Sequence, residues 1–213
     1  MDPESKPKFA IHEAAREGHS IDEDDRLPLH WAVSYNRLPI VSLLVQSKDF
    51  DVDAQDGSGW TPLMMAASRK EADEIVDILL RKGADVNMKT LHFAASKNNL
   101  DIARKLIANK AFARVKDKRG QLALHRAAAA GSVPMMRLLL EAKSPLNATD
   151  IDGMTALHHA ISEGHGDAAL LLLQAGAETD KDQEGRLAID LAPDAKTRKF
   201  ILQSAEREGI DLE

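Results

Sequence analysis

Apolar residues fall along the chain in short stretches of helical spacing, and these stretches come in pairs. RLPLHWAV begins at Arg26 and IVSLLVQ follows from Ile40, while WTPLMMAAS begins at Trp60 and IVDILLRKGADVN follows from Ile75. Within each stretch the apolar positions recur about every 3.6 residues, which is the period of an amphipathic helix. A residue that permits a tight turn separates the two halves of several pairs: Asn36, Gly131 and Gly164. The pattern predicts a repeating unit of turn, short helix, turn and longer helix.

Five close copies of this unit align on a leucine of the first helix. The aligned leucines are Leu29, Leu63, Leu91, Leu124 and Leu157, separated by 34, 28, 33 and 33 residues, and fainter copies place Ile11 and Ile189 in the same slot. A period near 33 with T-P-L-H-x-A and G-A-D-V-N is the signature of ankyrin repeats. We therefore expect an all-α repeat solenoid of about seven ankyrin repeats, the first incomplete, with short β-hairpin fingers. Small alanines such as Ala66 and Ala127 would let neighbouring helices approach closely.

The repeat pattern predicts one ankyrin-repeat domain over residues 1–213. Its expected parts are a flexible N-terminus (1–8), an incomplete first repeat (9–25), five repeats (26–58, 59–88, 89–118, 119–151, 152–184) and a C-terminal capping repeat (185–213). Two copies are short. About 15 residues are missing between Ile11 and Leu29, and about six are missing from the third finger before Leu91, relative to the 33-residue period. Either the first repeat is a half-repeat or the sequence omits segments of its parent protein.

Composition narrows the possible classes of protein. The chain has 213 residues, 44% of them hydrophobic, and no Cys. Without Cys there is no disulfide framework, thiolate zinc site or Cys nucleophile. The longest uninterrupted apolar run, Ala168 to Leu173, is far shorter than the roughly 20 residues of a membrane helix, and the polar N-terminus has no apolar signal region. We expect a cytoplasmic and nuclear protein with no membrane partner.

Charge is unevenly distributed along the chain. The net charge of −6 divides into −6 over residues 11–60, +6 over residues 61–120 and −6 over residues 121–213. Sequence order is spatial order in a solenoid, so the surface is expected to be acidic, basic and acidic in turn. This order could be chance clustering of solvated residues, or it could match a partner of complementary charge and set its register. The negative total argues against a nucleic-acid partner.

Catalytic and metal chemistry find little support in the sequence. Five histidines, His12, His30, His92, His125 and His158, occupy the same repeat slot. Stacked helices lie about 10 Å apart, so these histidines cannot share one metal, and we expect them to be structural. The segment from Asp180 resembles the start of a calcium loop, but Leu191 replaces its bidentate Glu. GSGWTP lacks the Lys and Ser/Thr of a phosphate loop. We expect no enzyme, no cofactor and no metal.

The variable positions of the first helices and the finger tips are the expected partner-binding surface. Aromatic residues and Arg, which anchor protein interfaces, gather at these positions although only 4% of the chain is aromatic. The candidate residues that follow the repeat's His slot, which we expect to face outward, are Trp31, Met65, Phe93, Arg126 and His159, and those one helical turn later are Tyr35, Arg69, Lys97 and Glu163.

Several segments resemble the gankyrin-type family of proteasome assembly chaperones, over nearly the whole chain from Phe9. They are DDRLPLHWAVS from Asp24, DGSGWTPLMMAAS from Asp56, LHFAASKNN from Leu91, VKDKRGQLALHRAAAAGS from Val115 and ISEGHGDAALLL from Ile161, the last most similar to fungal members. The resemblance implies a monomeric, non-enzymatic scaffold. Its concave face would hold the C-terminal domain of a proteasomal AAA-ATPase subunit during assembly of the regulatory particle base, with opposite charges paired in register.

The resemblance also extends the set of candidate contact residues. It implies that Asp24 and Asp56 pair with basic residues of the ATPase domain, that Arg26 and Lys116 pair with acidic ones, and that Trp60 contributes beside Trp31. Lys118 is a further candidate contact residue. Two other readings remain open at this point. One is an ankyrin adaptor for another signalling or transcription partner, and the other is a structural or regulatory unit of a larger protein.

Overall fold

The computed structural model describes residues 23–47, 50–210 and 212. Within these residues the chain forms eleven α-helices and one short 3₁₀ helix, with no strand. It divides into two compact units between Thr90 and Leu91. Most of the predicted first repeat, including Ile11 and His12, lies outside the described residues. None of the described helices is long and apolar enough to cross a membrane.

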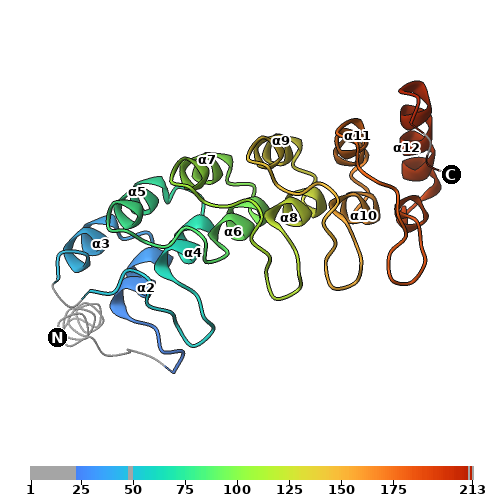
Figure 1. Ribbon diagram of the computed structural model, residues 1–213. Helices are drawn as coiled ribbons and strands as arrows, with labels where there is room; N and C mark the ends of the chain where they lie inside the picture. The colour runs from blue at the N-terminus through green and yellow to red at the C-terminus, as the bar shows by residue number, and fades with distance from the viewer. Residues whose placement is uncertain (1–22, 48–49, 211, 213) are drawn as a thin grey trace. The chain divides into compact units, whose positions relative to one another are not determined.

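The N-terminal unit contains two helix pairs. They are α2 (Pro28–Ser34) with α3 (Leu38–Leu44), and α4 (Pro62–Ala67) with α5 (Asp73–Arg81). Helix α2 packs on α4 and α3 packs on α5, so first helices and second helices form two rows (Figure 1). This arrangement is the one that the paired apolar stretches predict.

The C-terminal unit continues the same scheme with more helices. They are α6 (Thr90–Ser96), which begins at the boundary, α7 (Leu100–Ala108), α8 (Ala123–Ala129), α9 (Val133–Glu141), α10 (Ala156–Ser162), α11 (Gly166–Gln174), the 3₁₀ helix η1 (Ala188–Leu191) and α12 (Ala195–Arg207). Helices α8, α10 and η1 contact one another in sequence, and so do α7, α9, α11 and α12 (Figure 1). The final pair, η1 and α12, closes the stack.

The predicted core positions are buried in both units. The five aligned leucines have at most 5% of their surface exposed, and the alanines Ala32, Ala66, Ala94, Ala127 and Ala160 have at most 4%. A single repeat exposes an apolar face that only a neighbouring repeat can cover, so the stacking of repeats within each unit makes the core. The sequence prediction for these positions is confirmed.

The turn between the two helices of a repeat needs a left-handed residue. Asn36, Gly131 and Gly164 have φ angles of 52°, 64° and 78°, as their place in the pattern predicts. At Gly131 the position is also crowded, because a Cβ there would lie 2.6 Å from Nδ1 of His165. Glycine therefore satisfies both the backbone conformation and the packing at this turn.

The fingers are loops in this structure. Their tips are residues 56–60 (second finger), 117–121 (fourth), 150–154 (fifth) and 182–186 (sixth), and in each the first amide donates to the last carbonyl at 2.9 to 3.0 Å. No strand is assigned to them among the described residues, so the predicted β-hairpins are not confirmed. The loop 84–89 between α5 and α6 carries no such closed tip, in agreement with the shortened third finger.

Candidate partner-binding surfaces

An open groove marks the N-terminal unit, on the side of α2 and α4. It has a volume of about 220 Å³ and is lined by Arg26, Ser34, Ser58, Trp60, Met65, Ser68 and Arg69. Four of these seven residues, Arg26, Trp60, Met65 and Arg69, are candidate contact residues from the sequence. The fold thus brings together residues that are up to 43 positions apart along the chain.

An aromatic pair on α2 lies next to this groove. The Trp31 and Tyr35 rings stack with 5.6 Å between their centroids and 16° between their planes, because residues four apart share one helix face. The guanidinium carbon of Arg26 lies 5.3 Å from the Trp31 centroid, which is cation–π distance. Tyr35 nevertheless keeps 60% of its surface exposed. We call Arg26, Trp31 and Tyr35 the aromatic cluster.

Arg26 also joins this cluster to the second finger. Its Nε donates to Asp56 Oδ2 at 3.4 Å, and its Nη1 lies 3.7 Å from Asp24 Oδ2. The guanidinium therefore contacts two carboxylates. Arg26 also lines the groove, where it contributes positive charge beside Arg69.

The structure corrects the expected exposure of Asp56. Only 5% of this residue is exposed, and its Oδ1 accepts hydrogen bonds from the amides of Ser58 at 3.0 Å and Trp60 at 2.9 Å. Burial opposes ionisation, but these bonds and the Arg26 bond outweigh it, so the pKa of Asp56 is lowered. Asp56 closes its own finger and does not present a free carboxylate to a basic partner.

Met65 is the second correction, because it does not face outward. It is 6% exposed, and its Sδ accepts a hydrogen bond from the Ser34 hydroxyl at 3.3 Å. Neighbouring α2 covers α4 closely enough to bury most of the side chain. Met65 thus forms part of the groove floor, whereas Trp31 and Phe93, at the same repeat position, are half-buried.

The Asp56 arrangement recurs in every described finger tip. Oδ1 of Asp117, Asp150 and Asp182 likewise accepts from the amides two and four residues later, at 2.8 to 3.0 Å. The sequence contains a signal for this closed loop, namely an Asp followed three residues later by Gly in each finger. The fingers differ in the partner that the second oxygen of this carboxylate binds.

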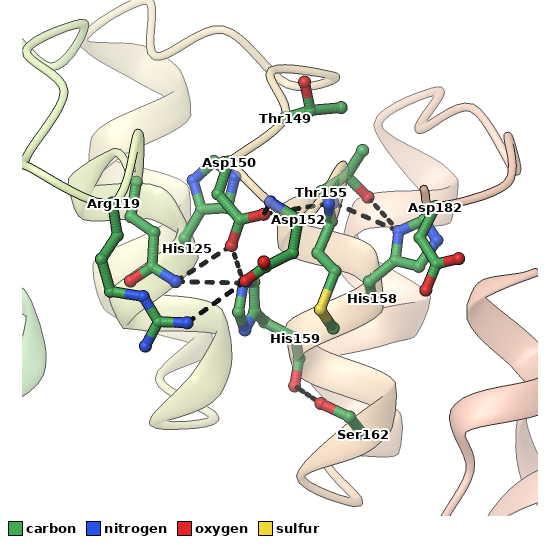
Figure 2. A network of polar contacts seen from close by, with 12 residues as sticks. Arg119, His125, Thr149, Asp150, Asp152, Thr155, His158, His159, Ser162 and Asp182 are labelled. Atoms are coloured by element: carbon green, nitrogen blue, oxygen red, sulfur yellow. Dashed lines mark hydrogen bonds and ion pairs between the residues drawn. The ribbon is translucent and has the colours of Figure 1, made fainter. Parts of the chain in front are cut away.

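In the C-terminal unit this second oxygen builds a buried polar network (Figure 2). Oδ2 of Asp150 accepts from Gln121 Nε2 at 3.0 Å and from His159 Nε2 at 2.8 Å. Burial raises and these hydrogen bonds lower the pKa of Asp150, with a net fall to about 2. His159, a candidate contact residue, is therefore anchored to a finger. On the outer side of the network, Arg119 pairs with Asp152 at 3.3 Å (Figure 2).

Among the other candidate contact residues of the C-terminal unit, some side chains bond to neighbouring groups of the chain and others are exposed to solvent. Arg126 donates to Asp117 Oδ2 at 2.7 Å, and Lys116 Nζ donates to the Thr149 carbonyl at 2.9 Å. The exposed candidates in this unit are Lys97, Lys116, Lys118 and Glu163. They supply charge of both signs that a partner can reach.

The repeated histidines have the structural role expected of them. Nδ1 of His30, His125 and His158 accepts from the backbone amide three residues earlier at 3.0 to 3.2 Å, so the proton of the neutral ring sits on Nε2. In His30 that Nε2 donates to the carbonyls of Ala54 and Trp60. Burial lowers the pKa of all three, and that of His125, which also lies near His159, to about 4. In the described part of the chain, no group of three or more His, Asp or Glu side chains could hold a metal ion.

Comparison with known proteins gives matches over most of the chain. The family model for ankyrin repeats (three copies) matches residues 6–90 and 91–183. An ankyrin repeat-containing protein of Schizosaccharomyces pombe, C6C3.08, is 34% identical over 99% of this chain and 94% of its own length. The probable 26S proteasome regulatory subunit p28 of Saccharomyces cerevisiae is 39% identical over 48% of this chain and 49% of its own. Human neurogenic locus notch homolog protein 1 is 33% identical over 53% of this chain, but over only 5% of its own length.

Proposed function

We propose that this chain, which belongs to the ankyrin repeat family, is an assembly chaperone for the base of the proteasome regulatory particle. Ankyrin repeats are protein-binding scaffolds, and that much follows from membership alone. The similarity to the yeast protein named as a probable 26S proteasome regulatory subunit supports the more specific role. In this proposal the concave face holds the C-terminal domain of one proteasomal AAA-ATPase subunit.

The observation that carries the proposal is the aromatic cluster at the edge of the groove. An exposed Tyr35 stacked on Trp31 offers a rigid apolar surface with a polar tip, which is the usual form of an interface anchor. The groove beside it is lined by Arg26 and Arg69 and by the serines Ser34, Ser58 and Ser68. Such a lining suits an acidic side chain of a partner, because guanidinium groups bind carboxylates strongly.

Surface charge supports the same proposal in the C-terminal unit. Lys97 and Lys116 are exposed on the basic part of the sequence, and Glu163 is exposed on the acidic part that follows. A partner with charges in the opposite order would be steered to one register. The proposal includes about seven repeats with hairpin-like fingers, a monomer in the absence of its partner, and a place in the cytoplasm and nucleus.

The test is selective capture. The full chain is immobilised and offered the C-terminal domains of the six proteasomal ATPases, one at a time. Strong capture of a single domain is expected, and capture of none would refute the chaperone role.

Variants then locate the surface on which the domain binds. Tyr35→Ala is expected to weaken binding about tenfold, since removing an aromatic anchor costs more than about 1 kcal/mol. Leu43→Ala is the matched control, because Leu43 is 53% exposed but does not line the groove. Equal effects of both variants would contradict the proposed anchor.

Charge reversal needs an exposed residue. At Arg26 it would place a carboxylate against the buried Asp56 and destabilise the finger. Arg69→Glu avoids this contact, because Arg69 is exposed on the groove rim. We expect it to weaken binding and reduce the salt dependence of association, and the melting temperature of the variant, measured beside that of the parent chain, shows whether its fold is kept.

An adaptor for a signalling or transcription partner is the second candidate. The similarity to a segment of human neurogenic locus notch homolog protein 1 favours it, since that segment is only 5% of a much longer chain. Failure to capture any ATPase domain, together with an intact fold, would favour this adaptor role.

A further inference from the structure

An exposed threonine precedes the tip of the fifth finger in the C-terminal unit. Of the six threonines, all in the described part of the chain, only Thr149 is exposed. The Thr197 hydroxyl, by comparison, donates to Asp194 at the start of α12. For the Thr149 hydroxyl no partner is recorded among the residues that the structure describes, and Figure 2 shows the residue beside the Asp150 network and not in it. Its hydroxyl is therefore accessible from solvent.

A lysine of the fourth finger reaches the same point. The two fingers lie side by side, because the Ile151 amide donates to the Arg119 carbonyl at 3.0 Å. Lys116 Nζ donates to the Thr149 carbonyl at 2.9 Å, which places an ammonium group next to the residue with the accessible hydroxyl. The equivalent residue of the sixth finger is Lys181, which is also exposed. An anion on Thr149 would thus have a cationic residue in the finger on either side.

The carboxylates nearest to Thr149 in the sequence are held by other groups. Asp150 is buried and accepts hydrogen bonds on both of its oxygens, and Asp152 pairs with Arg119 at 3.3 Å. Donors therefore compensate part of the negative charge around Thr149. Lys116 is the cation that the structure places in contact with this residue.

The sequence after Thr149 has the form that an acid-directed protein kinase recognises. Asp150 follows directly and Asp152 stands three residues later, and kinases select substrates partly by such charge patterns. The Asp152 carboxylate keeps 54% of its surface exposed, so an enzyme can reach it. Thr149 belongs to a stretch without regular structure, so no helix has to unwind before the hydroxyl is presented.

We propose that Thr149 is a phosphorylation site, and that its phosphate pairs with Lys116 and withdraws this lysine from the partner-binding surface. A kinase transfers the γ-phosphoryl group of ATP to Oγ1. The new ester bond forms, the bond to the leaving ADP breaks, and the hydroxyl proton passes to the base of the kinase. The phosphate carries about −1.5 to −2 charges, so the Lys116 ammonium moves from the Thr149 carbonyl to the stronger acceptor. The loss of partner binding rests on the proposed function, whereas the modification and the pairing do not.

The first experiment asks whether the site is a kinase substrate. The full chain is incubated with ATP and casein kinase 2, an acid-directed kinase, and the phosphorylated residues are located by mass spectrometry. Thr149 is expected to be the main site, with Thr149→Val as the control for phosphate elsewhere. Asp152→Asn should slow the reaction about fivefold, because one charge contact with the kinase is lost. Phosphate only at other residues, or an equal rate in the Asn variant, would refute recognition of this site.

The second experiment measures the environment of the phosphate by ³¹P NMR on the phosphorylated full chain. Lys116 should lower the second pKa of the phosphate from its ordinary value of about 6 by roughly half a pH unit, and Lys116→Gln should restore it. Lys118→Gln is the matched control, because it removes the same charge from an exposed residue of the same finger. Equal pKa changes in the two variants would refute the pairing with Lys116.

The third experiment concerns the partner. The phosphorylated and unmodified chains are compared in their affinity for the ATPase domain that the capture experiment selects, and phosphorylation should weaken binding about fivefold. In Lys116→Gln the same modification should have little further effect. An unchanged affinity would refute regulation of partner binding. If no ATPase domain is captured, the proposed function fails on its own test, while the first two experiments still decide whether Thr149 is phosphorylated and pairs with Lys116.

Discussion

Buried polar side chains set the pH range in which the repeats are stable. His125 is 1% exposed, and its Nδ1 accepts the Leu122 amide, so the ring has to remain neutral in the folded chain. An imidazolium there would lose this acceptor and carry an unpaired charge between repeats. Neutrality of one ring is thus a condition for the stability of the fourth repeat.

We predict that the free energy of unfolding of the C-terminal unit falls in mild acid. Burial lowers the pKa of folded His125 to about 4 from its ordinary 6.5. The full contribution is present above pH 6.5. As the pH falls from 6.5 to about 4, the unfolded chain takes up a proton that the folded chain refuses, and about 3 kcal/mol is lost. Urea unfolding at pH 7.5, 5.5 and 4.5 measures this loss.

His125→Gln provides the control for the acid effect. This variant is less stable at neutral pH, but its free energy of unfolding should change less between pH 7.5 and 4.5 than that of the parent chain. A pH dependence of equal size in both proteins would show that other groups cause the effect.

Each finger is an element closed by one carboxylate. Asp150 receives two backbone amides on one oxygen and two side-chain donors on the other. The loop itself contains few apolar residues that could hold it, so its shape depends on these hydrogen bonds. The position of His159 on α10, and hence of that part of the binding surface, depends on the same carboxylate.

We predict that Asp150→Asn lowers the free energy of unfolding by about 2–3 kcal/mol, because a buried hydrogen-bond network loses its charged acceptor. Asp152→Asn changes the same side chain two residues away, where the carboxylate is 54% exposed in its pair with Arg119. That change should cost less than about 0.5 kcal/mol. Chemical denaturation of both variants tests the contrast, which similar losses would contradict.

The whole chain consists of two compact units, and each is held together by contacts between neighbouring repeats. In a repeat protein stability is a sum of such nearest-neighbour terms. The C-terminal unit has more helix pairs and a terminal pair, η1 with α12, that covers its last repeat. The N-terminal unit has only two described helix pairs, fewer than the three repeats that repeat folds usually need.

We predict that residues 91–213 fold when expressed alone. Circular dichroism should show a helical spectrum and a cooperative thermal transition, because the capped stack keeps its own core. The fragment of residues 23–90 serves as the comparison and should be largely unfolded. A non-cooperative, weakly helical C-terminal fragment would contradict this division of stability.

The sequence predicted the burial of positions that recur in every repeat, and its predictions were least accurate at positions where the repeats differ. Leu63 and Ala66 are set by stacking, which every repeat shares, so period alone locates them. Met65 was placed on the surface because its slot is variable, and Asp56 because the family resemblance implied a basic partner residue for it, but neighbouring groups bury both side chains. His159 likewise shares its slot with Trp31, and only the presence of Asp150 in the adjoining finger turns it into an internal hydrogen-bond donor.

Backbone hydrogen bonds join the fourth, fifth and sixth finger tips of the C-terminal unit into a row that has a direction. The second residues of two tips, Ile151 and Gln183, donate to the carbonyls of Arg119 and Asp152, the third residues of the preceding tips, so the two ends of the row are chemically different. The end at Lys118 can be extended only by a group that brings an acceptor, and the end at Glu184 only by one that brings a donor. The row is therefore directional. Fingers added to it by protein engineering have to keep the same orientation.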